Sequence, residues 1–199
     1  IVATLILLPF GNGLVKLACM TVKDEEIETE PSAEEKAFRL LDPRFLETPG
    51  YAVDQCKLTA IDMAKHAKDG LLMSLDLLEN FDTEKAMRVK ELEDLVDRYE
   101  DELGSYMVKL SHAPLSKYDN HTISLLLHSI GDLERISDHS MNILSAAEEM
   151  HEKGMVFSSE GKAELKVFVE AVREILDLTV SAFEKNDIKR ASFVEPLEE

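Results

Sequence analysis

The stretch "ISLLLHSIGDLERISDHSMNIL", residues 123–144, decides the fold class. At about 100° per residue its apolar side chains share one broad sector of an α-helix, as in a helix packed within a bundle; they are Ile123, Leu126, Leu127, Ile130, Leu133 and Leu144. Glu134 falls inside this sector and Asp138 lies just past its edge. Like charges one turn apart cost a few tenths of a kcal/mol. Their place beside the core therefore needs an explanation.

The same helical period extends over most of the chain, and no strand pattern competes with it. With only eight Gly and six Pro the sequence does not suit a turn-rich all-β protein. Start and stop signals predict helices over about 49–80, 83–110, 117–153 and 159–186, and a fifth from about Ile188 to the end of the sequence. The signals are Thr48 with Pro49, Asp82 or Thr83, "SKYD" at 116–119, Gly154, and Ser158 or Ser159. Long helices joined by short links predict an all-α antiparallel bundle.

Composition narrows the possible partners. The 199 residues suggest one domain, or one domain with extensions. Forty acidic residues against 22 basic ones give a net charge of −18, which excludes a nucleic-acid partner because phosphate contacts need clustered Lys and Arg. The two cysteines, Cys19 and Cys56, form no metal or redox motif and indicate a reducing compartment.

The N-terminal part of the sequence differs from the rest. The first twenty residues contain one Lys and no acid, and Ile1–Phe10 are apolar enough for lipid but shorter than a span. We interpret residues 1–20 as the end of a last transmembrane helix and its exit; the alternative is a buried apolar helix packed on the domain. Residues 21–47 are predicted to be an acidic linker, and residues 48–199 a helical domain.

An internal repeat is visible at a shift of 105 residues. The stretch "LENFDTEKAMRVKELED" then lies over "FEKNDIKRASFVEPLEE", with Asp82 on Asp187 and Glu93 on Glu198. Two amphipathic helices agree at apolar positions in any case, but the matching acidic residues favour a duplication. The predicted organisation is a first three-helix repeat over about 48–154 and a truncated second repeat over about 158–199.

A second carboxylate pair has the spacing of the first. Glu93 and Asp97 in "ELEDLVD" flank the apolar residues Leu92 and Val96. Two helices of this kind could bring four carboxylates to one site, and such hard oxygen ligands suit magnesium, calcium, manganese or iron. The alternative is two solvated faces on which Arg98 and Arg135 form simple salt bridges.

Three segments resemble a known family. "DLERISDHSMNI", residues 132–143, resembles the third-helix signature of PhoU-like proteins. "LDPRFLETPGYAVDQCKLTAIDMAKHA", residues 41–67, resembles the segment that joins the membrane part of bacterial sodium/phosphate cotransporters to a cytosolic PhoU-like domain. "LILLPF", residues 5–10, looks like the close of the transporter's last membrane helix.

The resemblance implies three-helix repeats that bind multinuclear metal (iron, manganese or magnesium) through acidic motifs. In this chain the motifs are Glu93, Asp97, Glu134 and Asp138. Ser137 stands where the family usually has Gly and Ser140 where Ala is common; both are small enough to be tolerated. Of the second repeat's first motif only Glu198 is present, so a second site is not expected.

The function implied is that of a cytosolic regulatory domain, and not of an enzyme, in a sodium-dependent phosphate transporter. Its partners would be the transporter portion of the same polypeptide at the inner face of the plasma membrane, a second copy in a homodimer, and, for the parent protein, sodium and phosphate. One alternative is a metal-free helical scaffold with adaptable faces, formed by Met20, Met73, Met87, Met107 and Met141. Another is a ferritin-like di-metal oxidase, for which only one E-x-x-H pair, Glu148 and His151, is found where two are needed.

Overall fold

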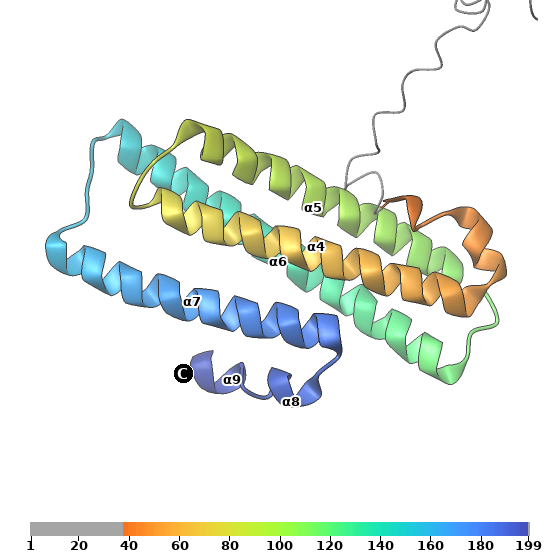
Figure 1. The fold of residues 1–199 in the computed structure, drawn as a ribbon. Helices are drawn as coiled ribbons and strands as arrows, with labels where there is room; N and C mark the ends of the chain where they lie inside the picture. The colour runs from red at the N-terminus through yellow and green to blue at the C-terminus, as the bar shows by residue number, and fades with distance from the viewer. Residues whose placement is uncertain (1–37, 199) are drawn as a thin grey trace, which may run out of the picture. The chain divides into compact units, whose positions relative to one another are not determined.

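The computed structural model describes residues 38–198, which lie within one compact unit, Ala37–Glu199. The elements are the 3-10 helix η2 (Pro43–Glu47) and the α-helices α4 (Pro49–Leu77), α5 (Thr83–Leu110), α6 (Lys117–Glu152), α7 (Ser159–Lys185), α8 (Ile188–Ala191) and α9 (Glu195–Glu198) (Figure 1). Residues 38–198 contain no strand, so the predicted all-α class is confirmed. The predicted membrane-helix tail, Ile1–Phe10, lies outside the described residues.

Side-chain caps fix the starts of three long helices. The Asp82 carboxylate accepts hydrogen bonds from the backbone N–H groups of Glu84 and Lys85, at 2.8 and 3.0 Å. Ser116 accepts one from the Asp119 N–H at 3.1 Å, and Ser158 one from the Gly161 N–H at 3.1 Å. Of the alternatives that the sequence left open, the N-caps are therefore Asp82 and Ser158. Thr48 precedes α4 as predicted, but its side chain makes no capping bond.

Replacing Asp82 with alanine should destabilise the protein by about 1 kcal/mol, because two N–H groups at the start of α5 lose their acceptor. Urea unfolding followed by circular dichroism measures this loss. Thr83→Ala, one residue later, is the control and should cost less than half as much, because Thr83 is not the N-cap. Equal losses in the two variants would show that the Asp82 cap does not stabilise α5.

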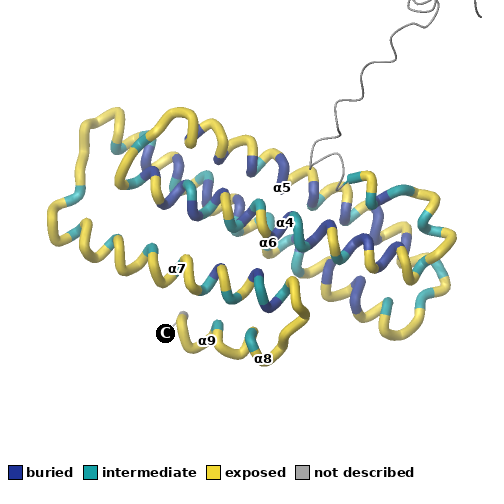
Figure 2. The backbone as a smooth tube through the Cα atoms, viewed as in Figure 1, coloured by how far each residue is buried: buried dark blue, intermediate teal, exposed yellow. Residues whose placement is uncertain are grey.

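The core lies where α4, α5 and α6 meet, since each of these helices packs on the other two. Consecutive helices are joined by short links and so run in alternate directions. Figure 2 shows the buried residues along the inner faces of these helices, whereas α7 is exposed along most of its length. The largest side chains that are fully buried include Met63, Leu77, Tyr99, Leu103, Met107 and Leu110.

Small residues let α4 and α6 approach closely. Ser137 and Ser140 on α6 are buried, and the Ser140 hydroxyl donates to the Ser137 carbonyl at 2.6 Å. A Cβ on Gly70 of α4 would lie 3.7 Å from the Ser140 hydroxyl oxygen. A larger side chain at either serine would push the helices apart, because core positions do not absorb extra volume without strain.

Residues 38–47, which we call the strap, pack on the bundle. Leu41 is buried in the main core, and the Phe38 ring stacks on Tyr99 of α5 with ring centroids 4.8 Å apart. The Tyr106 hydroxyl donates to the Asp42 carbonyl at 3.0 Å. Residues up to 47 were predicted to belong to the acidic linker, whereas in the structure residues 38–47 pack on α4 and α5.

Helix α7 begins the predicted second repeat and packs on α4. Leu176 joins Leu72 and Leu75 in a small apolar cluster. Ion pairs link Lys65 to Glu184 at 2.8 Å and Lys68 to Asp177 at 3.1 Å. These contacts hold α7 against one helix of the first repeat, so most of the α7 surface stays exposed.

The predicted fifth helix is split into α8 and α9. Asp187 caps α8 by accepting from the Arg190 N–H at 3.0 Å, as Asp82 caps α5. The chain then turns at Ser192–Val194 before α9 begins. Pro196 has no N–H to donate to the Ser192 carbonyl, so it does not continue α8 and instead lies in the first turn of α9.

Candidate functional site

The four predicted carboxylates lie at the margin where α5 and α6 meet. Helix α5 buries Leu92 and Val96, which places Glu93 and Asp97 at the edge of its packed face. Helix α6 buries Ile130 and Ser137, with Glu134 and Asp138 in the corresponding place. Glu93 and Glu134 are half-buried, whereas Asp97 and Asp138 are exposed.

The electrostatics of Glu93 place the two pairs near each other. Partial burial raises the pKa of Glu93 most, because it removes water from the charged form. Asp97 and Asp94 on the same helix raise it further, and so do Asp138 and Glu134 across the helix interface. The structure therefore brings the pair on α6 within electrostatic reach of Glu93.

The pKa values of Glu134 and Asp97 are raised by the same two causes, burial and neighbouring negative charge. Burial raises the pKa of Glu134 first, followed by the charges of Asp138, Asp97 and Glu100; Arg135 lowers it, as the smallest effect. The pKa of Asp97 is raised by burial and then by Asp138, Asp94 and Asp101. The site thus concentrates negative charge from two helices.

The two arginines considered from the sequence do not neutralise this charge by direct pairing. The Arg135 guanidinium lies 3.8 Å from the Asp132 carboxylate, and both side chains are exposed. The Arg98 guanidinium lies over the Phe38 ring, 4.8 Å from its centroid. Within residues 38–198 no ion pair joins a Lys or Arg to any of the four carboxylates.

The donor chemistry fits a hard divalent cation, because carboxylates are the ligands that magnesium, manganese and calcium prefer. The arrangement is not yet a coordination shell: no three His, Cys, Asp or Glu side chains in the described part of the chain lie close enough to hold one metal ion. Exposed side chains such as Asp97 and Asp138 would have to turn toward the cation.

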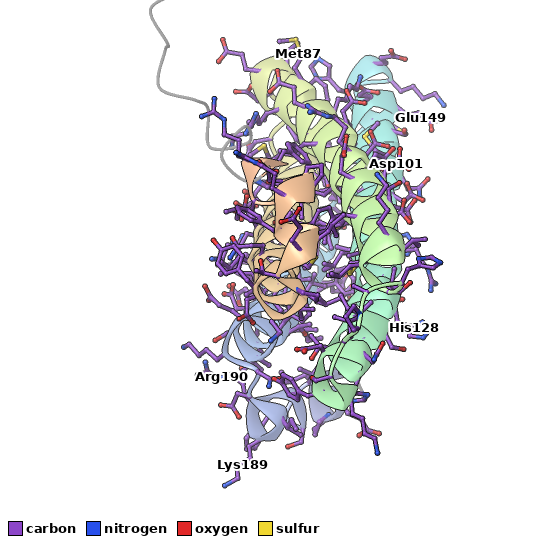
Figure 3. All side chains as sticks on the ribbon, turned by 90° about the vertical axis from the view of Figure 1, so that its right-hand side faces the viewer. Met87, Asp101, His128, Glu149, Lys189 and Arg190 are labelled. Atoms are coloured by element: carbon purple, nitrogen blue, oxygen red, sulfur yellow. The ribbon has the colours of Figure 1, made fainter. Side chains whose placement is uncertain are left out.

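Three further acids belong to this site and were not singled out from the sequence: Asp94, Glu100 and Asp101. Asp101 projects outward from α5 in Figure 3. The signal that could have found it is spacing, since Asp101 follows Asp97 by four residues, as Asp97 follows Glu93. The acidic row on α5 is therefore longer than a single pair.

Replacing Glu93 with glutamine should stabilise the metal-free protein at pH 7, by a few tenths of a kcal/mol. Because the folded state raises the pKa of Glu93, its charge opposes folding once the pH exceeds the ordinary carboxyl value of about 4.3. The gain should disappear in acid, where Glu93 is protonated in both states. Urea midpoints at two pH values test this.

The control for that experiment is Glu91→Gln. Glu91 is exposed and pairs with Arg88 at 2.9 Å, so its neutralisation should bring no gain at neutral pH. A stabilisation by Glu93→Gln that is the same at pH 3 and pH 7 would contradict the assignment of the effect to charge.

The E-x-x-H pair that suggested a di-metal enzyme has other contacts. The Glu148 carboxylate accepts a hydrogen bond from Lys90 of α5 at 2.9 Å. The His151 ring stacks on Phe81, with centroids 4.4 Å apart. These contacts hold the start of α5 and the loop before it against the end of α6. Within residues 38–198 the pair belongs to no group able to hold a metal.

Comparison with known proteins finds one family model that matches the three-helix unit α4–α6. Residues 60–147 match the family model described as PhoU domain. The match runs from α4 through α5 and most of α6, and it includes the four predicted carboxylates. No curated protein and no solved structure matches the chain. Within the helical unit α4–α6, residues 60–147 are therefore similar to a PhoU domain.

Proposed function

We propose, from the premise that residues 60–147 form a PhoU-like domain, that this chain is the cytosolic regulatory module of a sodium-dependent phosphate transporter. The observation that carries the proposal is the domain match over the helices that hold the acidic site. A PhoU domain supports a phosphate-related regulatory role. The module itself is not an enzyme, and the transported sodium and phosphate pass through the membrane portion of the parent protein.

The transporter context rests on the N-terminal half of the chain. Residues 41–67 resemble the segment that joins membrane part and PhoU-like domain in sodium/phosphate cotransporters, and Ile1–Phe10 resemble the end of a membrane helix. No helix within residues 38–198 has the length and apolar content needed to cross a bilayer. The strap attaches the chain at Phe38 and Leu41 to α5, which carries half of the acidic site.

The regulatory input we propose is a cluster of divalent metal ions, iron, manganese or magnesium, held by Glu93, Asp97, Glu134 and Asp138. The support is the unpaired negative charge between α5 and α6, because a cation would offset the repulsion that raises the pKa values of Glu93, Asp97 and Glu134. Metal binding would draw two helices together and so link metal status to the part of α5 that holds the strap.

Two observations favour the metal-free scaffold as the second candidate. The described carboxylates form no ready coordination shell, and several large apolar side chains are exposed, including Met87 on α5 and Phe168 on α7. Such faces suit contact with a protein partner, including a second copy of the chain. The two candidates differ in whether metal stabilises the fold.

Phosphate uptake by membrane vesicles that contain the whole parent polypeptide tests the proposal. With sodium outside, Glu93→Gln/Glu134→Gln should change the uptake rate by at least about twofold, since half of the charge that holds the metal is removed. The matched control is Glu170→Gln/Glu174→Gln, an exposed pair on α7, which should leave the rate unchanged. Uptake that does not depend on sodium would contradict the proposal. So would a Glu93→Gln/Glu134→Gln variant whose uptake rate equals that of the unchanged protein.

A further inference from the structure

One end of the bundle differs in charge from the rest. This end, which we call the strap end, comprises residues 38–51 and 105–120: the strap, the first turn of α4, the last turns of α5, and the start of α6 (Figure 1). It has four Lys or Arg and three acids, whereas residues 52–104 and 121–199 have 15 Lys or Arg and 30 acids. The strap end thus has a net charge of +1, whereas residues 52–104 and 121–199 together have a net charge of −15.

The cations of the strap end point into solvent. Lys109 and Lys117 are exposed, as are Arg39 and His112. The Arg44 side chain is 85% exposed although it pairs with Asp42. The Asp119 carboxylate accepts a hydrogen bond from the Ser116 hydroxyl at 2.7 Å in the cap of α6. Two of the three acids are therefore occupied by contacts within the chain, while the lysines have no ion pair among the described residues.

Large apolar and aromatic side chains lie among these cations. Tyr51, Val108 and Tyr118 are each more than half exposed. They come from three different helices, α4, α5 and α6, whose ends meet here, and Figure 3 looks onto this end. Exposed tyrosines with lysines and arginines are typical of surfaces that lie at the headgroup level of a membrane.

We propose that the strap end is a docking surface for anionic lipid headgroups, which holds the domain against the membrane with its acidic body directed away. Charge complementarity argues for this partner, because an anionic bilayer attracts Lys and Arg within about one Debye length and repels the acids of the other surfaces. A basic protein would instead be attracted by those acidic surfaces.

The proposal extends the proposed function, which attaches the domain to a membrane protein, but its test uses lipid alone. The full chain is mixed with vesicles of phosphatidylcholine, with or without about one third phosphatidylglycerol, and the bound fraction is measured by sedimentation. The unchanged protein should bind the anionic vesicles at least about fivefold better, and added salt should remove the difference.

The deciding comparison is between two charge reversals that change the net charge equally. Lys109→Glu/Lys117→Glu, in the last turn of α5 and first turn of α6, should reduce binding to anionic vesicles at least about fivefold. Lys162→Glu/Lys185→Glu, exposed lysines in the first and last turns of α7, should reduce it far less. Circular dichroism confirms that both variants fold.

Equal losses in the two variants would overturn the proposal, because they would show a response to net charge alone. Binding that is the same with and without anionic lipid would also overturn it, and would point to the apolar N-terminal residues instead. Neither result depends on metal or phosphate transport, so failure of this proposal is distinguishable from failure of the proposed function.

Discussion

Replacing Glu134 and Asp138 together with alanine should remove most of the stabilisation that Mn²⁺ gives to the folded protein. A ligand present at about 100 times its Kd adds about 2.7 kcal/mol to the free energy of unfolding. For a chain of this size that gain corresponds to a rise of about 5–10 °C in Tm. The variant should lose at least about 2 kcal/mol of it, because α6 would supply no carboxylate. Calorimetric unfolding with and without Mn²⁺ measures the difference.

The control for this prediction is Glu170→Ala/Glu174→Ala, which removes an exposed acidic pair of the same spacing from α7. It should keep the full response to Mn²⁺, so any loss in the first variant is specific to its position. Metal-dependent stabilisation that is the same in the unchanged protein and both variants would place the binding elsewhere. No stabilisation in any of them would favour the metal-free scaffold.

Replacing Leu103 with alanine should cost about 2–5 kcal/mol of stability, the largest effect expected from a single substitution here. Leu103 is fully buried on α5 and belongs to the main core, together with Tyr99, Met107 and Ile130. Its loss removes apolar contact and leaves a cavity at the point where α4, α5 and α6 meet. Urea unfolding gives the magnitude.

Leu58→Ala is the matched control, since Leu58 is 53% exposed on α4 and the same atoms are removed. Its cost should stay within about 0.5 kcal/mol. If the two variants lost equal stability, α5 would not be packed into the core as the structure has it, and the acidic margin between α5 and α6 would lose its basis.

The long helices could be predicted from the sequence because their signals are local. A cap such as Asp82 acts on N–H groups two and three residues away, and the apolar stripe of each helix repeats within a few turns. The interruption at Ser192–Val194 follows from Pro196, which does not continue a helix that begins at Ile188. A local signal was present there as well.

The strap could not be predicted in the same way. Phe38 and Leu41 are followed by Asp42 and Pro43, so the stretch has no helical period and follows an acidic segment. What holds it are contacts with residues about 60 positions later, the stacking on Tyr99 and the hydrogen bond from Tyr106. Long-range contacts of this kind do not produce a periodic pattern of apolar residues in the sequence.

The acidic site was predictable in part. The two i, i+4 pairs placed Glu93, Asp97, Glu134 and Asp138 at the margins of packed faces, but only the antiparallel packing of α5 on α6 brings the pairs together. That packing also brings Glu100 within electrostatic reach of Glu134, whereas Asp94 and Asp101 act on Glu93 and Asp97 from the same helix. Whether the carboxylates close on a cation depends on side-chain rotation, which spacing does not determine.

The most direct test of the proposed site is anomalous diffraction from crystals of this chain grown with Mn²⁺. Anomalous peaks are expected between α5 and α6, with carboxylate oxygens from both helices at about 2.0–2.6 Å. A map without a peak there, in which Glu93 and Asp97 turn away from Glu134 and Asp138 into solvent, would contradict the proposed site.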